Sequence, residues 1–269
     1  MRGAHVHGAQ AGAARIAAAL TIAGSDPTGG AGLQMDLSVF ALHGVHGMAV
    51  PTALTVQTTV GVKRTSPVFP SVVAEQLIAL LGDMRPQALK LGMLATDDIV
   101  LSVAGVLDRF PIPRVVDPVF RASDGSFLLE QRALGNLVER LIDGAALVTP
   151  NLPEAEALVG ETDPVRAAAA FLELGAEAVL VKGGHADGPA DDYLAARGAA
   201  GVWLRGERAD VGAVHGTGCA LSAAITARLA RGESLEPAAR AAKAWLARAI
   251  AESQALGKGA RILRLSGPA

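Results

Sequence analysis

Short apolar runs alternate along this chain with longer segments of helical periodicity. Strands are predicted at Ala17–Ala23, Met48–Val56, Ala88–Leu91, Arg114–Val119, Ala145–Thr149 and Ala178–Lys182, with an edge hairpin at Tyr193–Ala196 and Gly201–Leu204. Helices are predicted from Gly32 to about His43 and at Ser71–Met84, Asp97–Arg109, Leu129–Ile142, Leu152–Val159, Pro164–Leu174, Cys219–Arg231 and Leu235–Leu256. Strands that alternate with helices form βαβ units and pair in parallel. Because the strands are evenly spread, one α/β domain over residues 16–269 is predicted, with helices on both faces of a mostly parallel sheet.

Composition narrows the class of protein. Apolar residues make up 51% of the chain and aromatic residues only 3%, so the core must consist of Ala, Val and Leu, which suits a parallel sheet covered by helices. The net charge of −2 gives no indication of a nucleic acid or anionic membrane partner. The single cysteine excludes an internal disulfide and fits a reducing, cytoplasmic location. Residues 1–15 are predicted to be a disordered leader.

Polar and glycine-rich segments follow the predicted strands at five places. They are Gly24–Gly30, Gln57–Thr59, Asp117-Pro118, Asn151–Glu154 and Lys182–Gly184. In open α/β sheets, ligands bind outside the carboxyl ends of the strands. These segments are therefore expected to converge on one site.

The pentapeptide His215–Cys219 precedes an Ala/Leu-rich helical segment. Two glycines around Thr217 permit close backbone approach to a ligand. The helix behind them presents unpaired N–H groups and the positive end of its dipole. This pattern predicts an anion site, and in this setting phosphoryl transfer. The alternative interpretation is a glycine-rich helix start around a small core cysteine.

Seven motifs in register identify a resemblance. They are Thr21–Gly32, Leu54–Thr59, Lys90–Leu94, Val116–Val119, Thr149–Glu154, Val181–His185 and His215–Cys219. Their order and spacing resemble those of the hydroxymethylpyrimidine and phosphomethylpyrimidine kinases of thiamine biosynthesis, over roughly residues 17–255. The resemblance implies a ribokinase-like three-layer α/β/α fold, ATP and Mg²⁺ as cofactors, and a homodimer. It implies phosphorylation of 4-amino-5-hydroxymethyl-2-methylpyrimidine, its monophosphate, or both.

The resemblance places the chemistry at the pentapeptide. Gly216, Thr217 and Gly218 are expected to hold the transferring phosphoryl group through backbone N–H groups. Cys219 stands where many ribokinase-like enzymes carry an aspartate base, and it is expected to take the hydroxyl proton or position the acceptor oxygen. A helix N-terminus lowers a thiol pKa, which favours a thiolate here. The alternative is a buried, inert thiol.

Asn151, Glu154, Lys182 and Lys243 are the expected nucleotide-side residues. Asn151 and Glu154 would organise Mg²⁺ and its waters, because amide and carboxylate oxygens are the hard donors that this ion prefers. Their spacing also fits a helix-capping box. Lys182 would reach phosphate as a point charge; otherwise it extends from a strand end into solvent. Lys243 would line the nucleotide site or be a solvated helical lysine.

Four residues are expected on the substrate side. Asp36 and Gln57 resemble the family's pyrimidine contacts, and an amide can satisfy both a ring nitrogen and an exocyclic amine. Gly24 and Thr55 would bring backbone and a small side chain against the ring. The alternatives are a helix-polarity role for Asp36 and strand-end capping for Gln57.

Two departures from the family pattern stand out. After Val119 the family typically continues Met-Val-Ala-Lys-Ser-Gly-Asp, whereas this chain has Ser123 and Ser126 in place of the lysine and the aspartate. Arg121 is the nearby residue that can supply the missing charge to a phosphorylated substrate. The family's threonine after the cysteine is Ala220 here.

Two other functions remain open from the sequence. A pyridoxal or pyridoxine kinase would act on a similar hydroxymethyl group on an aromatic nitrogen ring. A non-catalytic pyrimidine-binding sensor would explain the altered 120–126 loop, but it would not need a phosphoryl site.

Overall fold

The structure is a computed structural model that describes residues 16–122, 125–184 and 188–267. The predicted leader (residues 1–15), Ser123 and His185 therefore lie outside the described residues.

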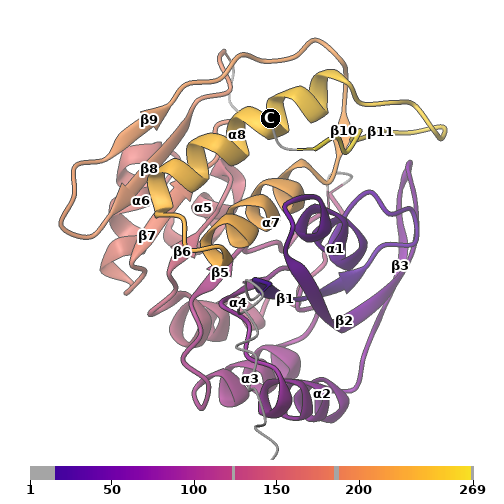
Figure 1. Ribbon diagram of the computed structural model, residues 1–269, viewed down its shortest axis with the longest axis vertical. Coiled ribbons are helices and arrows are strands. Elements are labelled where there is room, and N and C mark those ends of the chain that lie inside the picture. Colours follow the sequence, from indigo (N-terminus) through magenta and orange to yellow (C-terminus); the bar gives the residue numbers. More distant parts are fainter. Residues whose placement is uncertain (1–15, 123–124, 185–187, 268–269) are drawn as a thin grey trace, which may run out of the picture.

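One nine-stranded sheet runs through the described chain in the order β3-β2-β1-β4-β5-β6-β7-β8-β9 (Figure 1). The strands are β1 Ala18–Ser25, β2 His46–Thr58, β3 Gly61–Pro67, β4 Ala88–Leu91, β5 Arg114–Val116, β6 Leu147–Val148, β7 Ala178–Val181, β8 Asp192–Ala196 and β9 Val202–Leu204. In this order, the six central strands β2, β1, β4, β5, β6 and β7 pair in parallel. At the edges, β3 is antiparallel to β2, and β8 and β9 form an antiparallel hairpin. The predicted mostly parallel sheet and its edge hairpin are confirmed.

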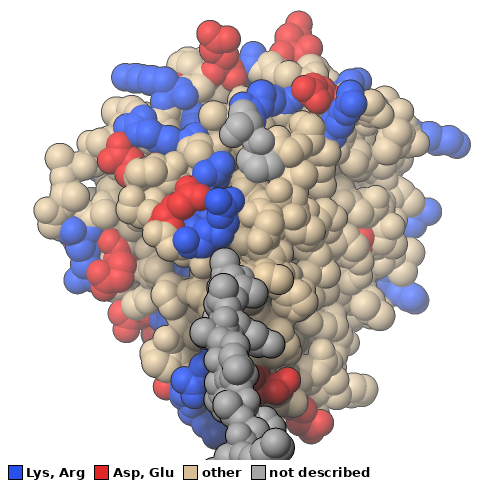
Figure 2. Space-filling view, in the orientation of Figure 1, with Lys and Arg blue, Asp and Glu red and all other residues tan. Residues whose placement is uncertain are grey.

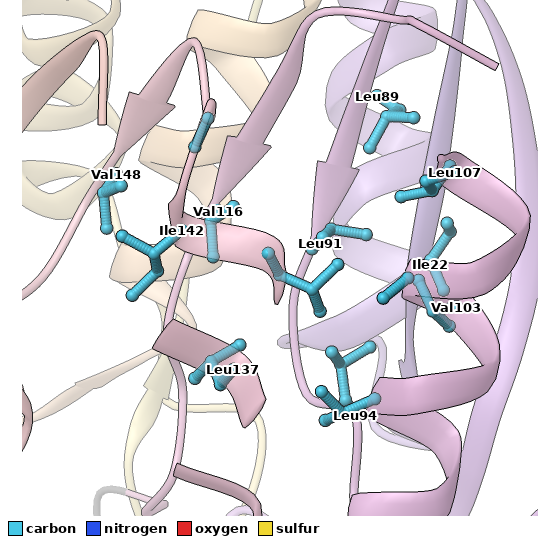
Figure 3. Close-up of a cluster of buried hydrophobic side chains, with 14 of the residues drawn as sticks. Ile22, Leu89, Leu91, Leu94, Val103, Leu107, Val116, Leu137, Ile142 and Val148 are labelled. Carbon is cyan, nitrogen blue, oxygen red and sulfur yellow. The ribbon is translucent and has the colours of Figure 1, made fainter. Parts of the chain in front are cut away.

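Helices cover both faces of the sheet. They are α1 Gly32–Leu42, α2 Pro70–Asp83, α3 Asp97–Leu107, α4 Ala133–Leu137, the π-helical turn η1 Val138–Ile142, α5 Leu152–Val159, α6 Pro164–Glu173, α7 Thr217–Ala230 and α8 Leu235–Ala251. One buried cluster joins the sheet to α2–α6 (Figure 3), and a second joins its other face to α1, α7 and α8. Within α7 the buried face is largely alanine, which lets the helix lie close to the central strands.

Besides shifts in the ends of several elements, such as the strand predicted at Arg114–Val119 that ends at Val116, three differences from the sequence predictions concern whole elements or their connections. Strand β3 was not predicted, because its Gly-Val-Lys-Arg-Thr-Ser-Pro sequence has no apolar alternation. The helix predicted from Leu129 begins at Ala133, since Leu129 forms a bridge with Ala95. Helix α8 ends at Ala251, and Gln254 then pairs with Ile262 beside a small two-stranded sheet, β10 (Val214–His215) and β11 (Arg261–Ile262).

Strand β2, which lies between β1 and the edge strand β3, contains an irregularity at Pro51. Its register with β1 shifts after the Ala23–Pro51 pair, and the Thr52 hydroxyl donates to the carbonyl of Met93. Beyond the shift, Thr55 and Gln57 lie on one face of β2, while Leu54 and Val56 are exposed on the other. The bulge therefore helps set which side chains face the site.

Charges of both signs are interspersed on the face shown in Figure 2, in line with the small net charge of −2. Among the described residues, no helix is both long enough and apolar enough to cross a membrane.

Candidate active site

A cavity of about 910 Å³ lies along the carboxyl ends of the parallel strands. Eleven of the twelve site residues expected from the sequence line it: Gly24, Thr55, Gln57, Asn151, Glu154, Lys182, Gly216, Thr217, Gly218, Cys219 and Lys243. Asp36 is the exception. The expected convergence of the strand-end segments is therefore present, which follows from the common direction of β1 and β4–β7.

Gly216 shapes the entry to helix α7. It is the N-cap residue, with φ 74° and ψ 15°, a left-handed conformation that favours glycine. A Cβ atom at this position would lie 1.7 Å from the carbonyl oxygen of Gly30. The first N–H groups of a helix have no intrahelical acceptor. Because residues 216–219 line the cavity, this helix start directs a positive dipole end into it.

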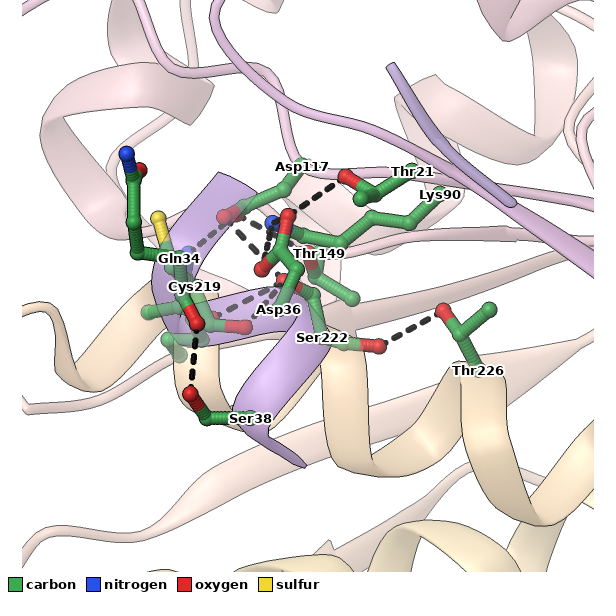
Figure 4. A network of polar contacts seen from close by, with 12 residues as sticks. Thr21, Gln34, Asp36, Ser38, Lys90, Asp117, Thr149, Cys219, Ser222 and Thr226 are labelled. Atoms are coloured by element: carbon green, nitrogen blue, oxygen red, sulfur yellow. Dashed lines mark hydrogen bonds and ion pairs between the residues drawn. The ribbon is translucent and has the colours of Figure 1, made fainter. Parts of the chain in front are cut away.

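A lysine and two carboxylates lie beside this helix start. Lys182 Nζ is 2.8 Å from Asp117 Oδ1 and 3.7 Å from Glu154 Oε2, and only 12% of the lysine side chain is exposed. Thr149 and Ser222 donate to the two oxygens of Asp117 (Figure 4). Burial raises the pKa of Asp117, but the charges of Lys182 and Lys90 outweigh it and lower that pKa below its usual range. Asp117 is thus an anion that holds Lys182 in place.

Asn151 and Glu154 form a complete capping box at the start of α5. Glu154 Oε2 accepts from the Asn151 N–H at 2.7 Å, and Asn151 Oδ1 accepts from the Glu154 N–H at 2.8 Å. Burial raises the pKa of Glu154 to about 7, with Lys182 opposing the shift and Asp117 adding to it. Glu154 Oε1 makes none of these contacts, so the capping box uses only one of the two carboxylate oxygens. The capping interpretation is confirmed, and it leaves a hard oxygen donor at the cavity.

These donors fit a hydrated Mg²⁺ better than a protein-enclosed one. Among the described residues, no three His, Cys, Asp or Glu side chains are grouped as a metal centre would need. Mg²⁺ usually keeps several waters and binds through one or two carboxylates plus substrate phosphates. Glu154 and Asn151 are suited to that arrangement.

Cys219 lines the cavity, but its thiol is not activated in the way that the sequence indicated. Burial raises the pKa of Cys219 to about 11, with Asp36 and Asp117 adding to the rise and Lys90 opposing it. The Gly32 N–H donates to the thiol without reversing the shift. The predicted low thiol pKa was wrong, because desolvation and two nearby carboxylates outweigh the charge of Lys90 and the Gly32 N–H.

Asp36 does not face the cavity, so the prediction of a pyrimidine contact was wrong. Its carboxylate is fully buried, with Oδ1 and Oδ2 at 2.7 and 2.8 Å from Lys90 Nζ and a 2.6 Å hydrogen bond from Thr21 (Figure 4). The alternative of a simple helix-polarity role is also inadequate, since the side chain pairs across to strand β4.

Ala220, which stands where the family has a threonine, is buried in the second core cluster.

Lys243 lines the cavity with its ammonium group already engaged. Nζ lies 2.6 Å from Asp192 Oδ2 and 2.5 Å from the Ala190 carbonyl, and 13% of its side chain is exposed. The other oxygen of Asp192 accepts from the Gly183 N–H at 3.0 Å. Lys243 is therefore not a solvated surface lysine: it ties α8 to Ala190 and Asp192, and Asp192 in turn binds Gly183.

The opposite part of the cavity contains the expected substrate-side residues. Thr55 donates to the Ser25 carbonyl at 3.0 Å, and the Gln57 amide lies 3.0 Å from His215 Nε2. A Cβ at Gly24 would meet Met93 Sδ at 2.7 Å, so glycine keeps this wall open. The sequence singled out neither Asp26 nor His215 as a site residue. Both belong to quoted motifs, but their contact across 189 positions has no local signal.

Arg121 also lines the cavity, and its guanidinium stacks 4.0 Å above the Phe127 ring. An Arg121–Phe127 bridge holds the two ends of this loop together. The loop therefore places a cation at the cavity, although the family's lysine is missing.

Comparison with known proteins agrees with this geometry. The sequence model of the family described as phosphomethylpyrimidine kinase matches residues 26–264. The hydroxymethylpyrimidine/phosphomethylpyrimidine kinase of Synechococcus elongatus is 43% identical over 253 residues, which cover 90% of this chain and 94% of that protein. The namesake from Escherichia coli is 41% identical over 249 residues, covering 90% and 93%.

Solved structures share the fold. Pyridoxal kinase from Staphylococcus aureus in complex with ADP superposes with a TM-score of 0.85 at 32% identity, covering 93% of each chain. Phosphomethylpyrimidine kinase from Clostridium difficile superposes with a TM-score of 0.77 at 37% identity, covering 87% of this chain and 99% of that one. The fold is therefore ribokinase-like. On the match over residues 26–264 and the identity to full-length relatives, the chain belongs to the phosphomethylpyrimidine kinase family.

Proposed function

We propose that this protein transfers the γ-phosphoryl group of ATP to 4-amino-5-hydroxymethyl-2-methylpyrimidine and to its monophosphate, in thiamine biosynthesis. The observation that carries the proposal is that one cavity contains both a region suited to phosphoryl transfer and a region suited to binding a heteroaromatic ring. The helix start at Gly216–Cys219 and the Lys182 ammonium border one part, and the Gln57 amide and Thr55 border another.

Phosphoryl transfer demands positioning and charge stabilisation more than covalent chemistry. The backbone N–H groups of Thr217 and Gly218 would donate to the equatorial oxygens as charge develops on them. Lys182 would add a positive charge from the side, since Asp117 holds its ammonium at 2.8 Å. These groups are in place before substrate binds, so little reorganisation is needed during transfer.

Cys219 would position the acceptor hydroxyl rather than remove its proton from the resting enzyme. A thiol with a pKa of about 11 is neutral at pH 7 and serves as a weak donor and acceptor. The loose transition state of phosphoryl transfer places little demand on a base early in the reaction. Placement of Sγ at the cavity surface is therefore the expected contribution of this residue.

Glu154 and Asn151 would hold Mg²⁺ through its water ligands. The bound ion supplies positive charge that neutralises the nucleotide phosphates. Lys243 would act on the nucleotide indirectly, because its contacts with Asp192 and Ala190 order the polypeptide next to the cavity.

Arg121 supports the second phosphorylation. A phosphomethyl group needs a cation in place of the family's lysine, and Arg121 is a cation at the cavity wall. Its stacking on Phe127 leaves the guanidinium edges able to meet phosphate oxygens.

The first test measures ADP release by the purified protein with Mg²⁺ and ATP. Parallel reactions contain the pyrimidine alcohol, its monophosphate, pyridoxal or no acceptor, and Lys182→Met protein purified in the same way controls for contaminating kinases. Turnover of both pyrimidines supports the full proposal, and turnover of the alcohol alone removes the second step. Preference for pyridoxal would assign the chain to the function of the structural neighbour from S. aureus. Binding of pyrimidine without turnover would instead indicate a sensor.

A homodimer is part of the proposal. Leu54 and Val56 are exposed on the outer face of β2, at 57% and 44%, and Val60 in the adjoining turn is exposed at 66%. A second copy that covers this face would bury them. Light scattering should give twice the chain mass, and Leu54→Lys with Val56→Lys should give the monomer mass. The cytoplasmic location stays a prediction from the single cysteine.

A further inference from the structure

Three cavity-lining residues from distant parts of the chain meet at one nitrogen atom. His215 Nε2 lies 2.8 Å from Asp26 Oδ2 and 3.0 Å from the side-chain amide of Gln57. Asp26 follows β1, Gln57 lies in β2, and His215 ends β10 directly before Gly216. The His215 and Asp26 side chains are 14% and 4% exposed, so protein rather than solvent determines their geometry.

The hydrogen on Nε2 is determined by Asp26. Burial raises the pKa of Asp26, but hydrogen bonds from His215 and Thr28 outweigh it and lower that pKa below its ordinary value. The Thr28 hydroxyl and N–H both donate to this carboxylate, each at 2.9 Å. Asp26 is therefore an acceptor only, and Nε2 must carry the hydrogen that points to it. A nitrogen that carries a hydrogen cannot accept one from Gln57, so the amide oxygen must face His215 and share the single Nε2 hydrogen with Asp26 Oδ2.

Thr55 imposes the same amide orientation independently. Its hydroxyl oxygen is 3.0 Å from the Ser25 carbonyl and 3.1 Å from the Gln57 amide. A carbonyl oxygen only accepts, so the single hydroxyl hydrogen is donated to Ser25. The amide group facing Thr55 must then donate, which places the Gln57 NH₂ there. The oxygen and nitrogen of an amide are assigned from such networks. A half-turn of the Gln57 amide exchanges the oxygen nearest Thr55 with the nitrogen nearest His215, and both ends of the network require this turned orientation.

We propose that Asp26 and His215 are positioning residues that hold the Gln57 amide with one N–H free to donate to a substrate ring nitrogen. The amide NH₂ has two hydrogens, and Thr55 uses one of them. The remaining hydrogen selects a heteroaromatic ring that presents an unprotonated nitrogen at that point, over a ring with C–H there. This inference rests on the proposed function and adds the origin of its ring selectivity.

The test compares the parent pyrimidine alcohol with two analogues, each having one ring nitrogen replaced by C–H. Binding is measured by calorimetry without nucleotide, and KM for each substrate is measured with Mg²⁺ and ATP. Wild-type protein should discriminate against one analogue by about 10- to 100-fold, because that analogue leaves the buried N–H of Gln57 without an acceptor. His215→Leu should reduce that discrimination to within threefold. It should raise the pyrimidine KM about tenfold and leave the ATP KM within twofold.

Further variants separate positioning from a general loss of structure. His215→Gln keeps a donor near the Nε2 position and should recover part of the discrimination. Gln57→Leu should lose discrimination as His215→Leu does, and the double variant should be no worse than Gln57→Leu alone. His46→Leu, at an exposed histidine in β2, is the matched control and should behave as wild type.

Two results would overturn the inference. The first is a His215→Leu variant that keeps full discrimination while kcat falls, which would show that the histidine acts only on the helix start at Gly216–Cys219. The second is additive losses in the double variant. Wild-type protein that binds the pyrimidine but does not phosphorylate it would contradict the proposed function alone. The inference would then still be decided by pyrimidine binding to wild type, to the two single variants and to the double variant. Wild-type protein that binds no pyrimidine overturns both.

Discussion

Lys90 and Asp36 form an ion pair in which neither side chain is exposed. Nζ lies 2.7 Å from Oδ1 and 2.8 Å from Oδ2, and Thr21 donates to Oδ2 (Figure 4). Burial by itself lowers an ammonium pKa, but the Asp36 charge raises the pKa of Lys90, so the pair stays ionised. The pair joins β4 to α1 beneath the cavity and contributes charge next to Cys219.

Removal of one partner should be far worse than removal of both. Lys90→Met should lower the free energy of unfolding by about 3–5 kcal/mol, because it leaves an uncompensated buried carboxylate. The Asp36→Leu, Lys90→Met double variant should lose less than Lys90→Met alone. Urea unfolding measures both. Asp108→Asn, which breaks the exposed pair with Arg140, is the control and should cost less than about 1 kcal/mol. Equal losses in the single and double variants would show that the charges are not coupled.

Cys219 should react slowly with alkylating reagents. Its pKa of about 11, against an ordinary value of 9.0, gives roughly 100-fold less thiolate at pH 7.5 than a free thiol has. Because it is the only cysteine in the chain, the rate of iodoacetamide incorporation by mass spectrometry reports this thiol alone. The rate should still be rising tenfold per pH unit at pH 9.5. A plateau below pH 8 would restore the low-pKa thiolate that the sequence predicted.

Two glycines with the same positive φ should respond differently to alanine. Gly216 and Gly212 both have φ 74°, but only at Gly216 would a Cβ meet backbone, at 1.7 Å from Gly30 O. Both substitutions incur the left-handed penalty of about 1 kcal/mol. Gly216→Ala should in addition displace the helix start and lower kcat at least 100-fold, whereas Gly212→Ala should keep kcat within threefold. Similar kcat values in the two variants would show that phosphoryl transfer does not depend on the position of the helix start.

Lys182→Met should lower kcat by about 100-fold or more, by analogy with the loss of one transition-state donor. Lys243→Met should raise the ATP KM with a smaller effect on kcat, because that ammonium is bound to Asp192 and Ala190. Steady-state kinetics at varied ATP separates the two, with the exposed Lys258→Met as control. A kcat effect at Lys243 as large as at Lys182 would mean that Lys243 reaches the phosphates directly.

His43 should make stability fall in mild acid. Both ring nitrogens are buried without a hydrogen-bond partner in the described structure, and the ring packs edge-on to Trp245 at 5.5 Å. Burial, then the charges of Arg228 and Arg231, lowers the pKa of His43 to about 4, with Glu233 opposing the shift. The unfolded chain therefore binds the extra proton first. Stability should decrease as pH falls from 6.5 to about 4, by up to about 3 kcal/mol, and should not depend on this group below that range.

The His43→Phe variant keeps the ring packing and removes the titration. Urea unfolding between pH 4 and 7.5 should show a shallower pH dependence for this variant than for wild type. His46→Gln, at the exposed histidine, should keep the wild-type slope. An unchanged slope in His43→Phe would assign the acid sensitivity to other groups.

Short-range patterns in the sequence were sufficient for the order of the elements and for most of the cavity lining. Strand ends, glycine pairs and the Asn151–Glu154 spacing are local signals, and parallel strands bring their carboxyl ends together without further information. The capping box at Asn151 was also readable, because its two hydrogen bonds span only three residues. Strand β3 was missed, because a polar edge strand has no apolar alternation.

The sequence by itself determined the fold class, the family and the glycine-shaped helix start at Gly216. Only the tertiary structure decided the protonation state of Cys219, the partner of Asp36 and the contact of His215 with Asp26. Each of these depends on burial and on charges from residues distant in the chain, and electrostatic energies follow spatial distance and desolvation rather than sequence spacing.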